Sequence, residues 1–257
     1  MNLAFYCTVL FTAAIAGGLL FQFTRTVKGE GLKLTLSFSA AYLLGLTLLH
    51  LFPELFASNL SHPGWYVIGG FMLQVVLDFF SHGIEHGHAH THKHASQRFF
   101  LMIMFSLWIH AFIEGMPFGS DAPEAHHHHH HGHDHGNGGH ADAHDHRSSL
   151  LIGISLHKIT ESMVFIALLI NSGFRLRKAW TWLVLFALMA PFGAITHHLI
   201  GDSVESLTPA VTGILIGILL HVSTTILFES EEGHRFNWMK FASILLGIAL
   251  SAAVSML

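Results

Sequence analysis

Long apolar runs alternate with short polar connectors along the chain. An apolar run of about 20 residues is what a helix needs to cross the hydrocarbon core of a bilayer. The connectors contain the glycine, proline and charged residues that end helices. We therefore predict eight spanning helices, over Leu3–Phe23, Leu34–Phe56, Trp65–His86, Phe99–Gly119, Ser149–Asn171, Ala179–Ile200, Thr208–Phe228 and Phe236–Leu257.

The composition agrees with a membrane protein. Of 257 residues, 51% are hydrophobic and only 11% are charged, whereas soluble domains have about 25% charged residues. The first run begins close to Met1 without a basic segment or a small-residue cleavage site, so we expect it to be a mature helix. The sequence thus predicts an all-α protein that forms one transmembrane domain, 1–257, in the lipid bilayer.

The basic residues predict the orientation. If the N-terminus is outside, 10 of the 12 Lys and Arg residues fall in the inner connectors or beside them, as cytoplasmic loops require. The two exceptions are Arg147 at the outer mouth and Lys158 within the membrane. We therefore expect both termini to be extracytoplasmic, in a cell membrane and preferably a bacterial inner membrane.

Several classes of chemistry are excluded. The single cysteine, Cys7, can form neither an intramolecular disulfide nor a thiolate cage. The formal net charge is only −4 and there is no basic run, so the sequence gives no sign of nucleic-acid binding. It also lacks an ATP motif or glycine-rich phosphate loop that would indicate a pump.

Histidine is the unusual residue, with 25 copies. Many of them lie in two connectors, a predicted cytoplasmic loop over 87–98 and a predicted extracytoplasmic loop over 120–148. A mid-chain run that continues into mixed His, Asp and Gly is typical of a metal-capturing loop rather than an expression tag, because many weak sites raise the local metal concentration. The predicted capture residues are His126, His127, His128, His129, His130, His131, His133 and His135.

The most specific pattern is a pair of His-x-x-x-Glu motifs, His110 with Glu114 in the fourth run and His157 with Glu161 in the fifth. Residues four apart lie on one face of a helix, so two facing helices would supply four metal ligands. Imidazole and carboxylate suit Zn²⁺ and also Fe²⁺, Mn²⁺ or Cd²⁺. Each ionisable group costs about 2.5–3.5 kcal/mol in mid-membrane, which favours a function over an interhelical hydrogen bond.

Lys158 lies within the second motif. It is three residues before Glu161, so its ammonium can pair with Glu161 or, across the helix gap, with Glu114. A cation there would take the space of a second metal. Gly115 and Pro117 indicate either a kink that opens a cavity at the site or an ordinary proline kink.

Other polar residues suggest a path for the ion. His50 and Glu54 form an outer entrance or a capped helix terminus, and His197 and His198 form interface or metal contacts. The remaining candidates lie towards the cytoplasm. The predicted path residues are His50, Glu54, Asp78, His82, Glu85, His86, His221 and Glu229.

At these residues the chain resembles the ZIP family (Zrt-, Irt-like proteins) of divalent metal transporters. The family's fourth-helix pattern, His-Asn-x-x-(Glu/Asp)-Gly, corresponds here to His-Ala-x-x-Glu-Gly over 110–115. Its fifth-helix pattern, (His/Gln)-(Glu/Asp)-x-x-x-Glu, with Lys at the second place in one branch, corresponds to His-Lys-x-x-Glu over 157–161, one residue shorter before the last Glu. The stretch from Phe186 to Gly193 resembles the family's apolar-Pro-x-Gly segment.

The resemblance implies a fold and a function. The fold would be a 3+2+3 bundle, with outer triplets related by an inverted repeat and the two metal helices in the middle. The function would be transport of a divalent metal, Zn²⁺ first of all, into the cytoplasm by alternating access, without enzyme activity and with a homodimer as one assembly. Ala111 and Lys158 stand where binuclear members have Asn and a carboxylate, which implies a single metal with Lys158 as surrogate for the second ion.

Three alternatives remain open. A cation-diffusion exporter would have six helices, an Asp-rich site and a cytoplasmic C-terminal domain, none of which the sequence indicates. An intramembrane metal-dependent hydrolase could use a His/Glu zinc site to activate water, but there is no His-Glu-x-x-His motif and no evident separate base. A non-transporting metal sensor would differ from a transporter in metal flux.

Overall fold

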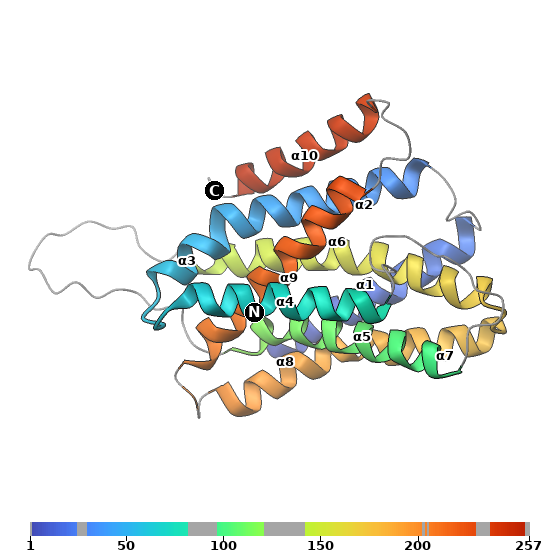
Figure 1. Cartoon of the computed structure of the whole chain (residues 1–257), viewed down its shortest axis with the longest axis horizontal. Coiled ribbons are helices and arrows are strands. Elements are labelled where there is room, and N and C mark those ends of the chain that lie inside the picture. The colour runs from blue at the N-terminus through green and yellow to red at the C-terminus, as the bar shows by residue number, and fades with distance from the viewer. Residues whose placement is uncertain are drawn as a thin grey trace, which may run out of the picture.

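The computed structural model describes residues 2–24, 30–81, 97–120, 142–201, 204, 206–229 and 237–254. Within these residues the chain is helical and contains no strand. Most helices run roughly along the long axis of the molecule (Figure 1). In order they are α1 Leu3–Thr24, α2 Glu30–Leu46, the π-helix η1 Thr47–Leu51, α3 Phe52–Ala57, α4 Pro63–Ser81, α5 Gln97–Gly115, the 3₁₀-helix η3 Met116–Gly119, α6 Asp142–Asn171, α7 Leu176–Ala187, α8 Met189–Ile200, α9 Leu207–Glu229 and α10 Trp238–Val254.

The helices agree with the predicted class of an all-α, multi-pass membrane protein. Seven helical segments of the described residues are long and apolar enough to cross a membrane. Each of the first seven predicted runs contains or overlaps one of them. The eighth run corresponds to α10, which is apolar but shorter, with 17 residues.

Two of the predicted runs are interrupted. The second changes from α-helix to π-helix at Thr47–Leu51, just before Pro53. The sixth is divided into α7 and α8 at Leu188, three residues before Pro191. In both cases proline removes an N–H donor and its ring pushes against the carbonyl four residues earlier, so the regular helical hydrogen bonding changes there.

Two predicted boundaries also need correction. Helix α6 begins at Asp142 and α5 at Gln97, so the ends of the two predicted histidine-rich loops are helical. Helix α4 is described to Ser81, and its predicted continuation to His86 lies outside the described residues. The rest of both loops lies outside the described residues. So do His82, Glu85, His86 and all the predicted capture histidines, from His126 to His135.

The helices pack in two groups. In one group α1 packs on α6, α7 and α8, and α5 packs on α8; in the other α2 packs on α10 and α9, and α9 packs on α4. The groups meet where α6 contacts α2 and where α5 contacts α4. Helix α6 accordingly passes through the middle of the bundle (Figure 1).

Glycines let helices approach closely within each group. A Cβ at Gly115 of α5 would collide with the carbonyl of Ala190 in α8, and one at Gly193 of α8 would collide with the carbonyl of Phe112. Helices α5 and α8 therefore touch backbone to backbone beside Glu114. The predicted apolar-Pro-x-Gly segment supports one of the two His/Glu helices in this way.

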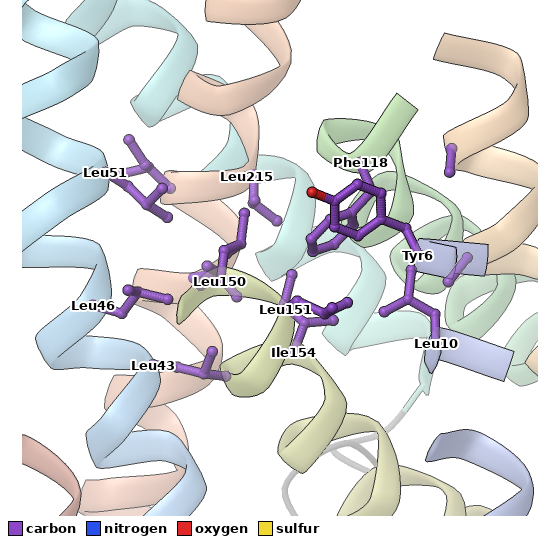
Figure 2. Close-up of a cluster of buried hydrophobic side chains, with 14 of the residues drawn as sticks. Tyr6, Leu10, Leu43, Leu46, Leu51, Phe118, Leu150, Leu151, Ile154 and Leu215 are labelled. Atoms are coloured by element: carbon purple, nitrogen blue, oxygen red, sulfur yellow. The ribbon is translucent and has the colours of Figure 1, made fainter. Parts of the chain in front are cut away.

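Two apolar clusters lie on either side of the two His-x-x-x-Glu motifs along the helix axes. The first gathers side chains that precede His157 on α6 and follow Glu114 in η3, together with residues of α1, α2 and α9 (Figure 2). In it the rings of Tyr6 and Phe118 are 5.3 Å apart. The second gathers residues of α5 from Ile103 to Ala111, residues after Glu161 on α6, and residues of α7. The polar residues of the two motifs are thus enclosed along the helix axes by hydrocarbon.

Candidate metal centre

Helices α5 and α6 bring the two predicted motifs together. His110, Glu114 and His157 are completely buried, and Glu161 is 2% exposed. Within α5, His110 Nε2 lies 3.2 Å from Glu114 Oε1. Between the helices, His157 Nε2 lies 3.8 Å from Glu114 Oε1, and His110 Nε2 lies 4.0 Å from Glu161 Oε1. The i,i+4 spacing therefore places each pair on one face, and the two faces meet.

The separations suit a single metal ion. His110, Glu114 and His157 each offer one ligand atom, and these atoms all lie within 4.8 Å of one another. Zinc bonds of about 2.0–2.2 Å in a tetrahedron put ligand atoms about 3.4 Å apart. Within this group the distances of 3.2 and 3.8 Å are close to that value. Glu161 lies beside the group, with its Oε1 4.0 Å from His110 Nε2.

The two carboxylates each divide their oxygens between two neighbours. Oε1 of Glu114 and of Glu161 faces the imidazoles. Oε2 of each faces the ammonium of Lys158, at 2.5 Å from Glu114 and 2.8 Å from Glu161. Carboxylates that bridge two cations have this arrangement, and Lys158 supplies one of the cations.

Apart from the two carboxylates, the described contacts of the Lys158 ammonium include no polar group that could serve as a metal ligand. The residue is 1% exposed, and its ammonium lies 4.8 Å from the centre of the Phe186 ring. Ala111 on the facing helix belongs to the second apolar cluster. A favourable cation–π contact and two carboxylates thus surround the charge.

Several buried atoms of the centre lack a hydrogen-bond partner among the described residues. They are both ring nitrogens of His157, Oε1 of Glu114, and Oε1 of Glu161. Buried polar atoms nearly always have a partner, and each of these three groups can coordinate a cation. The residues present therefore fit a metal ion between the two helices.

Gln74 of α4 also contacts this centre, which the sequence reading missed. Its amide oxygen Oε1 lies 3.0 Å from Nδ1 of His110, and both side chains are completely buried. The available signal was one uncharged polar residue within the apolar stretch before Asp78. Many such residues only satisfy a local hydrogen bond, so the sequence alone did not connect Gln74 to His110.

His197 lies in a separate buried cluster. Its Nδ1 is 2.6 Å from the carbonyl oxygen of Met116, and its Nε2 is 3.2 Å from the hydroxyl of Thr208. Thr208 also donates to the hydroxyl of Ser120, whose carbonyl accepts a hydrogen bond from Arg147. Of the two roles predicted for His197, the interface role fits these contacts, because hydrogen bonding occupies both ring nitrogens.

The predicted path residues are spread over several helices. His50 is buried within η1, Glu54 is exposed on α3, Asp78 lies on α4, and His221 lies on α9 beside the Phe71 ring. Among the described residues none of them, nor His198, joins the metal-capable group. Their part in a path stays a prediction, and for Glu229 only the position at the end of α9 is described.

Fold and centre together define an all-α protein with helices of membrane type and a buried His/Glu cluster that could hold a metal. A comparison with protein-family models finds no match to this chain, and a comparison with curated proteins finds none either.

Proposed function

We propose that the protein moves a divalent transition metal, Zn²⁺ first of all, across the membrane into the cytoplasm through a mononuclear His/Glu site. The observation that carries the proposal is the meeting of two His-x-x-x-Glu faces inside membrane-length helices, with all four side chains buried. Burying these groups in a membrane is costly, and a hydrogen bond that only joins two helices would not need four ionisable side chains. Fe²⁺, Mn²⁺ and Cd²⁺ are further candidate substrates, since they accept the same ligands.

The charge of the centre supports a mobile ion. The two carboxylates and the single ammonium of Lys158 give the empty centre a net charge of about −1. A centre with a carboxylate in place of Lys158 would have a larger negative charge. An empty carrier with less net charge costs less to rearrange in the bilayer. Lys158 thus serves as surrogate for the second ion of binuclear transporters, and one metal binds beside it.

Alternating access is the mechanism that we propose for this fold. The centre lies between the two apolar clusters. The first cluster contains side chains from both helix groups, and the second contains side chains from the group of α1 and α5 to α8. An ion can leave the centre only if one of these clusters opens, and in alternating access the two clusters open in turn. The motifs and the helix order support a ZIP-like 3+2+3 bundle with inverted repeats, and direction and family assignment rest on that resemblance.

The test is metal uptake into proteoliposomes, with Zn²⁺, Fe²⁺, Mn²⁺ and Cd²⁺ in competition. We expect uptake by the wild type, and uptake at the level of empty liposomes for His110→Ala and Glu161→Ala. Ser106→Ala is the matched control, because Ser106 is buried on α5 one turn before His110 and its hydroxyl donates to the carbonyl of Leu77. Near-normal uptake in both ligand variants would overturn the site, and metal binding without any flux in the wild type would indicate a sensor.

A further inference from the structure

Gln74 joins the two helix groups at the candidate metal centre. It lies on α4, whereas His110 lies on α5 in the other group. The amide oxygen of Gln74 can only accept a hydrogen bond, so the Nδ1 atom that lies 3.0 Å from it must carry the proton. In a neutral imidazole the lone pair is then on Nε2.

We propose that Gln74 is a positioning residue, which holds the proton of His110 on Nδ1 and turns Nε2 toward the carboxylates of Glu114 and Glu161. The distances from Nε2 to those carboxylates, 3.2 and 4.0 Å, are the ones that a shared ion would bridge. A ligand histidine whose other nitrogen is fixed binds metal more tightly, because its orientation and tautomer are already set. This inference rests on the proposed function only where it concerns the transported ion.

The neutrality of the amide matters as much as its position. A carboxylate at residue 74 would also accept the Nδ1 proton, but it would make the imidazole a stronger ligand and would add a buried negative charge. Gln74 orients His110 without that additional attraction. Gln74 therefore sets an intermediate affinity, at which an ion is captured and then released.

His157 shows what the centre is like without such a partner. Its ring makes no hydrogen bond to a described residue, and its nearest ion-pair contact is Glu114 at 3.8 Å. Of the two histidines, His110 is thus the one whose orientation the protein fixes in advance. Removing Gln74 makes His110 resemble His157 in this respect.

The experiment compares three variants of the full chain with the wild type. Gln74→Met keeps the length of the side chain and removes the acceptor, and Gln74→Glu keeps an acceptor and adds charge. Ser106→Ala is the matched control, because Ser106 Oγ donates to the carbonyl of Leu77 at 2.6 Å and so joins the same two helices. It removes a hydrogen bond between α4 and α5 without touching the metal ligands.

The first readout is zinc uptake in proteoliposomes. We expect Gln74→Met to raise KM about 10- to 100-fold, as is usual when the partner of a ligand histidine is lost, with a much smaller change in maximal rate. Gln74→Glu should lower KM and also lower the maximal rate, because release becomes slower. Ser106→Ala should keep the KM of the wild type, and a rise equal to that of Gln74→Met would overturn the positioning role.

The second readout needs no metal. In the full chain labelled with ¹⁵N-histidine, the difference spectrum between wild type and His110→Asn isolates the His110 signals. We expect a protonated Nδ1 in the wild type and in Ser106→Ala, and a changed tautomer in Gln74→Met. An unchanged His110 spectrum in Gln74→Met would overturn the inference even if transport is confirmed, whereas a changed spectrum with no zinc uptake by the wild type would overturn only the proposed function.

Discussion

Three histidine side chains of the described residues are completely buried, and they belong to two different regions. His197 contacts Met116 through one ring nitrogen and Thr208 through the other. His110 uses Nδ1 for Gln74 and points Nε2 at carboxylates, and His157 makes no hydrogen bond to a described residue. Burial is the same in all three cases, but the neighbours of the ring nitrogens differ.

This difference teaches how to separate a structural histidine from a ligand. A buried imidazole with both nitrogens engaged by hydrogen-bonding groups of the protein has no lone pair to offer a metal. A nitrogen that faces carboxylate oxygens lies where a cation would be attracted. By this criterion His110 and His157 belong to a group that could hold a metal, whereas His197 joins η3, α8 and α9.

The largest expected effect contrasts His110 with His197. We expect His110→Ala to abolish zinc uptake per folded molecule, and His197→Ala to retain most of it while lowering the free energy of unfolding by about 1–3 kcal/mol, since a buried carbonyl loses its donor. Uptake in proteoliposomes, normalised to folded protein by size-exclusion chromatography, measures both. The comparison would fail if His197→Ala were inactive when folded and His110→Ala active.

Lys158 tests the electrostatic side of the centre. Lys158→Met leaves Glu114 and Glu161 buried without their ammonium, so the free energy of unfolding in detergent should fall by about 3–5 kcal/mol. Saturating Zn²⁺ should restore more stability to this variant than to the wild type, because a bound cation replaces the lost charge. The matched control is Lys240→Met, which removes a buried ammonium that donates to the carbonyl of Leu227. A larger loss at Lys240 than at Lys158 would contradict the account.

Two glycines sharpen the comparison between the helices that carry the ligands. Gly115→Ala forces α5 away from the Ala190 carbonyl of α8 and should cost about 1–3 kcal/mol through overpacking. A Cβ at Gly153 of α6 would instead meet side-chain atoms of Tyr42 and Leu43, and side chains adjust at a lower cost than a helix backbone. Because alanine also gains about 0.5–1 kcal/mol over glycine within a helix, Gly153→Ala should cost less than Gly115→Ala. Denaturant unfolding of both variants checks the order, and a greater loss at Gly153 would be inconsistent with it.

The smallest effect concerns Thr208. Thr208→Val removes the hydroxyl that contacts His197 and Ser120, at a cost of about 0.5–1.5 kcal/mol for a hydrogen bond. We expect zinc uptake to keep the KM of the wild type, since the ligands are untouched. Thermal unfolding gives the stability, and a KM shift as large as that of Gln74→Met would place Thr208 with the metal centre.

The sequence predicted those parts of the fold that depend on local pattern. Length and apolarity were sufficient for seven helices of membrane length, and the i,i+4 spacing was sufficient to put His110 beside Glu114. The position of Lys158 predicted an ion pair with Glu161 or with Glu114, and the structure contains both pairs. These features need only helix geometry and the cost of burying charge.

The remaining features depend on tertiary contacts. Nothing in the local pattern relates Gln74 to His110, 36 residues later, or His197 to Met116, 81 residues earlier. The break at Leu188 was missed because the apolar run continues through it, although Pro191 marked the place. The helical start of α6 at Asp142 was missed because its polar first turns have the composition of a loop.

The central claim is that one metal ion binds between α5 and α6 with Lys158 in the place of a second. Anomalous diffraction at the zinc edge, on crystals of the full chain grown with Zn²⁺, counts and locates the ions directly. We predict a single peak within bonding distance of His110, Glu114, His157 and Glu161 in the wild type, and a second peak beside residue 158 in Lys158→Asp. Two peaks at this centre with Lys158 intact, or no peak between these four side chains, would contradict the account.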